Sequence, residues 1–85
     1  MIIKVAYRKN LKLTEGKLAS QVAHAVKNLG LTPIDCNIIV LKYSDKKFFE
    51  IVKDIVFYKK YYIQKDKGLT QVQPNTITCC AWISY

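Results

Sequence analysis

The amino-acid sequence predicts a three-layer α/β domain with a mixed sheet of about four strands. Four short runs of apolar and β-branched residues are typical of strands, and two segments between them repeat apolar residues at helical spacing. The chain of 85 residues has the length of one small domain, so residues 1–85 form a single unit. The elements follow in the order β-α-β-α-β-β, which predicts a mainly parallel sheet with both helices packed on it.

The first half of the chain predicts a strand, a helix and a second strand. Residues 1–7 begin with apolar, β-branched side chains, and a basic loop follows over 8–13. Thr14 is a good N-cap for a helix over 15–29, and Gly30 suits its C-cap. The apolar positions at helical spacing are Leu18, Val22, Ala25 and Leu29, with Ala19, Ala23 and Val26 widening the face. The strand over 37–43 contains the non-alternating run 38–41, which predicts cover on both faces.

The second half predicts one more helix and two strands. Ser44 is the expected N-cap of a helix over 45–56, whose apolar stripe consists of Phe48, Ile51, Val52 and Ile55. A strand is predicted over 61–65. Residues 66–75 contain Gly68 and Pro74 and read as a loop, and residues 76–84 are rich in strand formers.

The charge of the chain points to a polyanionic partner. Fourteen lysine and arginine residues against six acidic residues leave a formal net charge of +8. Hydrophobic residues make up 51% of the chain, which excludes a disordered basic tail. Nucleic acid is the first partner to expect for such a protein, although the sign of the charge does not separate RNA from DNA or from an anionic membrane surface.

The three cysteines and the single histidine limit the chemistry of any site. An odd number of cysteines without a secretory segment favours a reducing compartment. Cys79 and Cys80 are adjacent on a predicted strand, so their side chains point to opposite faces and do not bind a metal together. No window of 18 apolar residues occurs, and we expect a soluble, intracellular protein.

A polar stripe runs along the first predicted helix beside its apolar face. Lys17, Gln21, His24 and Asn28 lie within about 60° of helical arc, as a solvated surface would also place them. Lys17 lies in the first turn, where the helix dipole disfavours a cation by roughly 0.3–1 kcal/mol. An anion or a developing oxyanion beside Lys17 and Lys12 would account for this placement. His24 is the single histidine of the chain and a candidate general acid or base, but a lone helix histidine is more often structural.

Three further features leave a functional and a structural interpretation open. Asp66 precedes a Gly-containing turn, where a carboxylate commonly caps its own backbone, yet loops at the carboxyl ends of parallel strands also line ligand crevices. A nucleophile pair of Cys36 and His24 rests only on the presence of both residues. Three tyrosines are interleaved with two lysines at Tyr58, Lys59, Lys60, Tyr61 and Tyr62. The rings could stack on bases of single-stranded nucleic acid while the lysines hold phosphates, but packing of the rings in the core is slightly favoured.

Two segments resemble the motifs of the archaeal and eukaryotic type of peptidyl-tRNA hydrolase. Residues 15–25, Glu-Gly-Lys-Leu-Ala-Ser-Gln-Val-Ala-His-Ala, are similar to its first-helix motif, Gly-Lys followed by Ala-Ala-Gln and His-Ala. Residues 66–76, Asp-Lys-Gly-Leu-Thr-Gln-Val-Gln-Pro-Asn-Thr, resemble its second motif, Asp-Ala-Gly-Arg-Thr-Gln-Ile-x-Pro-Gly-Thr. This chain departs from the second motif at Lys67, Leu69 and Asn75, and its connection over 30–36 is shorter than usual in the family. With the strand at 38–41, the resemblance spans nearly the whole chain.

The resemblance implies hydrolysis of the ester that joins a peptide to the 3′ ribose of tRNA. Asp66 would orient or deprotonate the attacking water, and Thr70 would position it. Lys17 would stabilise the tetrahedral oxyanion or a terminal phosphate, and His24 would protonate the leaving ribose oxygen or bind the terminal adenosine. The resemblance implies that Gln21, Gln71 and Thr76 support the site. Lys12, which is near Lys17 in the sequence, is a further expected substrate-binding residue.

The expected partner is peptidyl-tRNA in the cytoplasm, with no cofactor, metal, membrane or DNA, and a homodimer is left open. The main alternative is a non-catalytic module of the same fold that binds tRNA or another RNA. A protein-interaction domain whose basic face meets an acidic protein is the third hypothesis. It gives no reason for the Lys17 and Asp66 motifs to occur together.

Overall fold

Four strands form one mixed sheet in the order β2-β1-β4-β3. The structure, a computed structural model, describes residues 1–30, 36–66 and 75–84. In chain order its elements are β1 (Ile2–Arg8), the 3₁₀ helix η1 (Lys9–Leu11), α1 (Glu15–Lys27), β2 (Asn37–Tyr43), α2 (Asp45–Ile55), β3 (Tyr61–Lys65) and β4 (Ile77–Ser84). The predicted order of strands and longer helices is confirmed.

The sheet has fewer parallel pairings than the sequence predicted. β1 pairs with β2 in parallel, whereas β4 pairs antiparallel with both β1 and β3. β1, β2 and β3 therefore run in one direction, and β4 alone runs the other way in the middle of the sheet. A mixed sheet is confirmed, but the expectation that it is mainly parallel is wrong, because one central antiparallel strand changes two of the three pairings.

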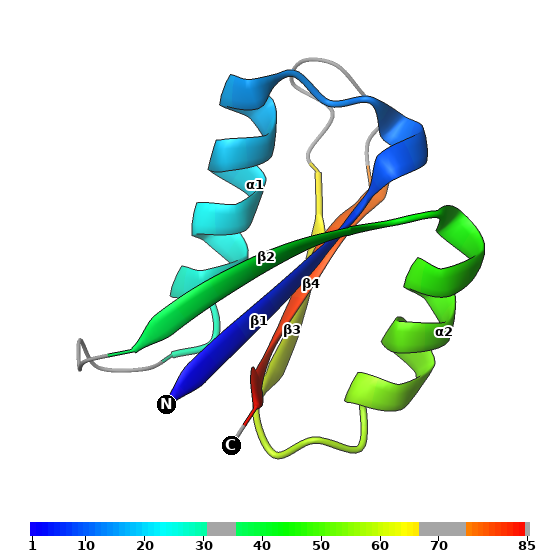
Figure 1. Ribbon diagram of the computed structural model, residues 1–85. Helices are drawn as coiled ribbons and strands as arrows, with labels where there is room; N and C mark the ends of the chain where they lie inside the picture. Colours follow the sequence, from blue (N-terminus) through cyan, green and yellow to red (C-terminus); the bar gives the residue numbers. More distant parts are fainter. Residues whose placement is uncertain (31–35, 67–74, 85) are drawn as a thin grey trace.

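The two helices cover opposite faces of the sheet, which gives three layers (Figure 1). Ile3, Val5 and Cys79 pack against residues of α1, while Ala6 and Cys80 pack against residues of α2. This alternation follows from the strand period of two. It also confirms that the adjacent cysteines point to opposite faces.

Both helices begin at the predicted caps. The Thr14 hydroxyl accepts a hydrogen bond from the Lys17 amide at 3.4 Å, and the Ser44 hydroxyl accepts one from the Lys47 amide at 3.5 Å. α1 ends at Lys27 with Asn28 as its C-cap, earlier than predicted; Gly30 follows with a left-handed φ of 73°. In residues 1–30, 36–66 and 75–84, no helix is long and apolar enough to cross a membrane.

Arg8, predicted to lie in a basic loop, joins the end of β1 to α2 and β4. Its Nε and Nη2 donate to the two Asp45 carboxylate oxygens at 3.0 and 2.9 Å, and its Nη1 donates to the Ile77 carbonyl at 2.8 Å. The hydrogen bond from Arg8 lowers the pKa of Asp45. Asp45 lies in the first turn of α2, where the helix dipole also favours a negative charge.

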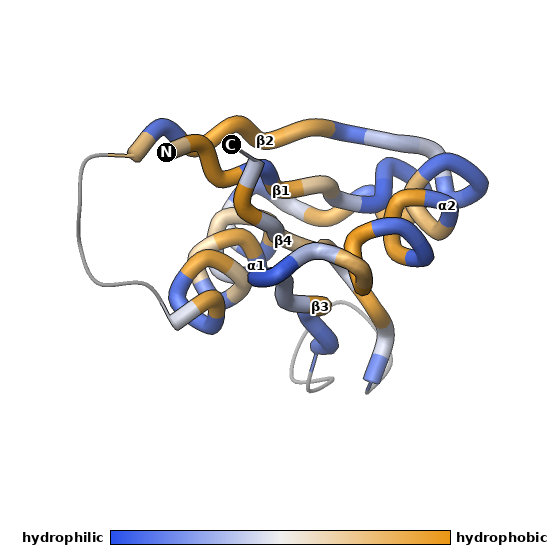
Figure 2. The backbone as a smooth tube through the Cα atoms, turned by 90° about the horizontal axis from the view of Figure 1, so that it is seen from below, coloured by the Kyte–Doolittle hydropathy of each residue, from blue (hydrophilic) through white to orange (hydrophobic). Residues whose placement is uncertain are grey.

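β2 is exposed on both faces, contrary to the prediction that helices cover it. Ile38, Ile39 and Val40 remain 49, 40 and 44% exposed. β2 is an edge strand, and α1 packs mainly over β4, β3 and β1. Figure 2 shows β2 as a largely hydrophobic strand along one edge of the molecule. A continuous apolar run thus indicated a strand correctly but did not reveal how far the helices reach across the sheet.

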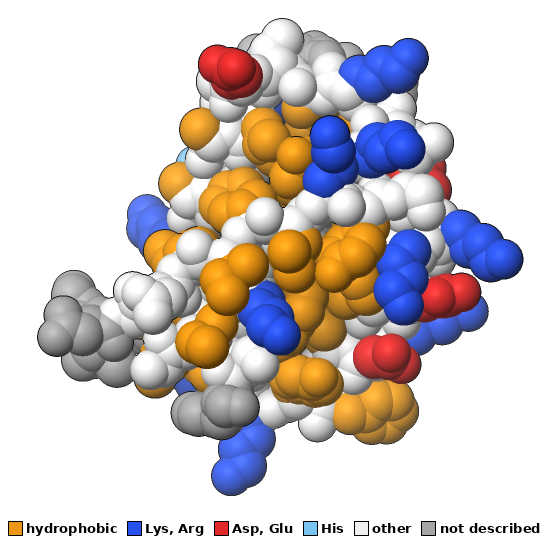
Figure 3. All heavy atoms as spheres, in the orientation of Figure 1, with side chains coloured by type: hydrophobic (Ala, Val, Ile, Leu, Met, Phe, Trp, Pro, Cys, Tyr) orange, Lys and Arg blue, Asp and Glu red, His pale blue; other side chains and the backbone are white. Residues whose placement is uncertain are grey.

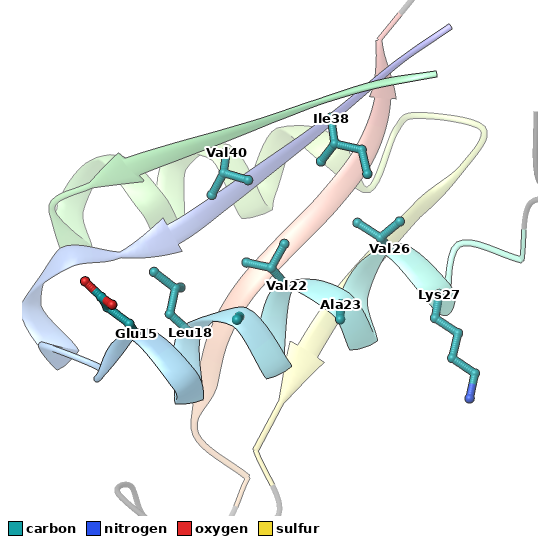
Figure 4. Close-up of a pocket in the computed structure, with 9 residues that line it drawn as sticks. Glu15, Leu18, Val22, Ala23, Val26, Lys27, Ile38 and Val40 are labelled. Carbon is teal, nitrogen blue, oxygen red and sulfur yellow. The ribbon is translucent and has the colours of Figure 1, made fainter. Parts of the chain in front are cut away.

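An apolar groove of about 670 Å³ lies between α1 and β2. Leu18, Val22 and Val26 form its wall on α1, and Ile38 and Val40 form its wall on β2 (Figure 4). In the space-filling view, hydrophobic side chains gather over β2, with lysines among them (Figure 3). The sheet therefore covers only part of the predicted apolar face of α1, and the rest of this face lines the groove.

The three cysteines should differ in reactivity at neutral pH. Burial raises the pKa of the Cys79 thiol to about 11 and that of Cys80 to about 12, whereas Cys36 is exposed. Because the thiolate is the reactive form, a chromogenic disulfide reagent should modify one thiol in the native protein and all three after unfolding. Cys36→Ser should abolish the fast reaction. Rapid modification of a second thiol in the native protein would contradict this burial.

Candidate active site

Lys17 and Asp66 form an ion pair between the first turn of α1 and the end of β3. The Lys17 Nζ contacts Asp66 Oδ1, and the two side chains are only 13 and 3% exposed. The start of α1 and the end of β3 lie at the same end of the molecule (Figure 1). The cation that opposes the helix dipole therefore has a buried carboxylate beside it. Removing one partner of such a pair is strongly destabilising, by about 3–5 kcal/mol, because the other charge stays buried.

Gln21 extends the pair into a chain of buried polar groups. Its Nε2 donates to Asp66 Oδ1 at 3.0 Å, and its Oε1 accepts a hydrogen bond from the Thr78 hydroxyl at 2.6 Å. Gln21 is 4% exposed and Thr78 is fully buried. The Thr78 hydroxyl can donate only to an oxygen of the amide, so it directs the Gln21 NH₂ group towards the carboxylate. Lys17 and Gln21 thus hold the same carboxylate oxygen from successive turns of α1.

Backbone hydrogen bonds hold Asp66 at the end of the strand pair. Its amide donates to the Thr76 carbonyl at 2.9 Å, and its carbonyl accepts from the Asn75 amide at 2.7 Å. The register of β3 and β4 shifts between Gln64 and Lys65, immediately before Asp66. Asn75 has a left-handed φ of 65°. These contacts bring the two ends of the second motif together and place the Asp66 side chain under α1.

Of the other predicted site residues, the structure describes His24, Lys12 and Thr76. His24 is exposed on α1, two turns beyond Lys17 on the same side by helical spacing. Lys12 is exposed at the end of η1, in a left-handed conformation. Thr76 is half-buried and contacts Asp66 through its backbone. Thr70 and Gln71 lie outside the described residues.

Two polar residues of the site escaped the sequence analysis. Thr78 is fully buried in β4 and orients Gln21; Gln64 is 8% exposed in β3, and its carbonyl lies 3.5 Å from the Thr78 hydroxyl. Thr78 sits in a run of strand formers, where a threonine is unremarkable. Thr78 and Cys79 both face α1, beside the register shift between β3 and β4, whereas a strand period of two would place Thr78 on the opposite face.

The arrangement offers polar groups for acyl-transfer chemistry. A lysine ammonium can stabilise an oxyanion, a carboxylate can orient or deprotonate water, and an exposed histidine can donate a proton. Across the described ranges, no group of three or more His, Cys, Asp or Glu side chains lies close enough to hold a metal ion.

Comparison with known proteins identifies the family. The family model for peptidyl-tRNA hydrolase PTH2 matches residues 1–83. The chain is 34% identical to the peptidyl-tRNA hydrolase of Thermoplasma volcanium, over 93% of this chain and 82% of the relative. It is 33 and 32% identical to those of Thermoplasma acidophilum and Methanopyrus kandleri, in both cases over 88% of this chain and 77% of the relative.

The alignment with the Thermoplasma volcanium protein runs over 103 positions, more than the 85 residues of this chain. That relative therefore carries residues without counterparts here. The match to the family model, over residues 1–83, includes both segments that form the Lys17, Gln21 and Asp66 cluster. The chain belongs to the peptidyl-tRNA hydrolase PTH2 family.

Proposed function

We propose that this protein hydrolyses the ester between a peptide and the 3′ ribose of tRNA, and so releases free tRNA. The observation that carries the proposal is the buried contact of Lys17 and Gln21 with Asp66, which joins the two family motifs in one site. The relatives in the comparison are named for the same activity. Cytoplasm is the expected compartment, because the substrate arises during translation.

The reaction adds water across one ester bond. The water oxygen attacks the ester carbonyl carbon, and the tetrahedral intermediate then expels the 3′ oxygen of the ribose. One water proton stays with the enzyme or solvent as the peptide leaves as a carboxylate, and the ribose oxygen gains a proton. Asp66 orients or deprotonates the water, and Thr70 positions it, as the family motif implies.

Lys17 is the cation of the site for the developing oxyanion. Lys17 belongs to the first turn of α1, and the N-terminus of a helix also favours negative charge. The pair with Asp66 fixes the Lys17 side chain before substrate binds, so little reorganisation is needed during the reaction. A terminal phosphate of the tRNA is the alternative ligand of this ammonium.

The position of His24 favours a contact with the terminal adenosine. His24 lies seven positions after Lys17, which corresponds to about 10 Å along the helix. Two side chains at this separation suit different parts of a substrate better than one reacting bond. Protonation of the leaving ribose oxygen is the other role of His24. Lys12, three residues before α1, would hold phosphates of the tRNA.

Substitution in the ion pair should separate an enzyme from an RNA-binding module. We expect Asp66→Asn and Lys17→Met each to lower the single-turnover cleavage of an N-acylated aminoacyl-tRNA by ~10²-fold or more. The Asp66→Asn variant should keep its tRNA affinity, because loss of a negative charge does not weaken phosphate binding. Free aminoacyl-tRNA serves as the substrate control.

The matched control variants are Asp54→Asn and Lys46→Met, which change the same residue types at exposed positions of α2. Circular dichroism should establish that each variant folds; if Lys17→Met does not, Asp66→Asn decides alone. Stoichiometric binding of the acylated tRNA by the wild-type protein without faster ester cleavage would refute the enzymatic proposal and support the RNA-binding module.

Thr78 should act as a positioning residue through Gln21. Thr78→Val keeps the shape of the side chain but removes the hydroxyl that orients the Gln21 amide. We expect kcat to fall by about tenfold with little change in KM, and Thr78→Ser to restore most of the rate, because a lost buried hydrogen bond is worth about 1–3 kcal/mol. Equal rates for the Val and Ser variants would show that the hydroxyl has no such role.

Binding of tRNA should weaken steeply as salt rises. Each neutralised phosphate adds roughly 0.7–0.9 to the slope of log affinity against log salt, and about three to six contacts suit one small basic face. Titrations of deacylated tRNA at three ionic strengths measure this slope. A flat response, or equal affinity for an acidic polypeptide, would instead favour an acidic protein as partner.

A further inference from the structure

Aromatic rings and lysines project into solvent from the turn between α2 and β3. Phe57 is 88% exposed, Tyr58 46% and Tyr61 40%, and the exposed Lys59 and Lys60 stand between them. The expectation that the tyrosines pack in the core is therefore wrong for Tyr58 and Tyr61. It holds for Tyr62, which packs against the core on the α1 face.

The turn encloses a hollow of about 450 Å³ against the end of β4. Its lining residues are Tyr58, Lys59, Lys60, Ile83 and Ser84. The hollow thus combines an aromatic residue, two lysines and an aliphatic residue. Cavities of this size and mixed lining commonly accept a small ligand or part of a larger one.

The backbone of the turn is held by hydrogen bonds at both ends. The amides of Phe57 and Tyr58 donate to the carbonyls of Asp54 and Ile55 at 3.2 and 2.9 Å. The Lys60 carbonyl accepts from the Ile83 amide at 3.3 Å. The aromatic residues are therefore carried by an ordered segment, which reduces the entropy that a ligand must overcome.

The combination of groups favours a nucleic-acid ligand. Phe57 has no polar atom that gains from contact with water, and burying such a ring is worth about 1.5–3 kcal/mol. Nucleobases stack on aromatic rings irrespective of sequence, and neighbouring lysines neutralise the phosphates. An acidic peptide would use the lysines but would leave the rings without a specific partner.

We propose that residues 57–61 form a second RNA contact, which stacks an unpaired base and holds the adjacent phosphates. The contact lies at the opposite end of β3 from Asp66 (Figure 1). The five residue steps from Tyr61 to Asp66 span about 17 Å of extended chain. A tRNA with its 3′ end at Lys17 can extend along the sheet to this turn. The identification of the RNA as tRNA rests on the proposed function; the contact itself does not.

The test compares RNA affinity between variants of the turn and a charge-matched control. Phe57→Ala should weaken binding of a short unstructured oligouridylate by about fivefold or more, since stacking contributes about 1–3 kcal/mol per base. The double variant Lys59→Gln with Lys60→Gln should lower the salt slope by about 1.4. The control, Lys46→Gln with Lys53→Gln, removes the same charge from exposed positions of α2 and should change the slope less.

Fluorescence anisotropy with oligouridylate and with deacylated tRNA measures these affinities, and thermal melting checks that each variant folds. Unchanged binding by Phe57→Ala, or equal losses in the two lysine pairs, would overturn the proposal. Competition by polyglutamate as strong as that by RNA would also overturn it and would indicate an acidic protein partner. Failure of the wild-type protein to cleave peptidyl-tRNA would refute the proposed function but would leave these binding results decisive.

Discussion

The buried contact between Lys17 and Asp66 is the interaction on which the candidate site depends. It joins the first turn of α1 to the end of β3, two elements far apart in the chain. A buried carboxylate needs this cation, and Gln21 with Thr78 supplies the hydrogen bonds that complete its surroundings. The same groups that stabilise the buried charge also bring both family motifs together. Stability of the fold and geometry of the site are therefore coupled at this point.

The antiparallel strand β4 makes this contact feasible. It lies between β1 and β3, carries Thr78 on the face under α1, and displaces β3 outward, so that α1 spans β1, β4 and β3. The consequence appears at the other edge. β2 receives little cover, and an apolar groove remains between it and α1. One arrangement thus accounts both for the burial of the polar cluster and for the exposure of Ile38 and Val40.

The positive charge of the protein is used in two different ways. Arg8 and Lys17 are paired with Asp45 and Asp66, so they serve mainly to join elements and to shape the site. Most other lysines are exposed and contribute to the field that attracts polyanions. Lys59 and Lys60 differ from a general basic surface because exposed aromatic rings accompany them. A net charge alone does not reveal this division, since it depends on which cations find a carboxylate in the folded chain.

The sequence by itself determined the strands, the two longer helices, their order and their N-caps, because hydrophobic periodicity and the capping residues Thr14 and Ser44 act locally. It also indicated Lys17, Gln21 and Asp66 through the two motifs. Only the tertiary structure decided that β4 enters the middle of the sheet, that β2 stays uncovered and that Tyr58 and Tyr61 face solvent. It alone revealed Thr78 as the partner of Gln21. The physical reason is that pairing and burial depend on which distant segment occupies the neighbouring space, and no local pattern records that choice.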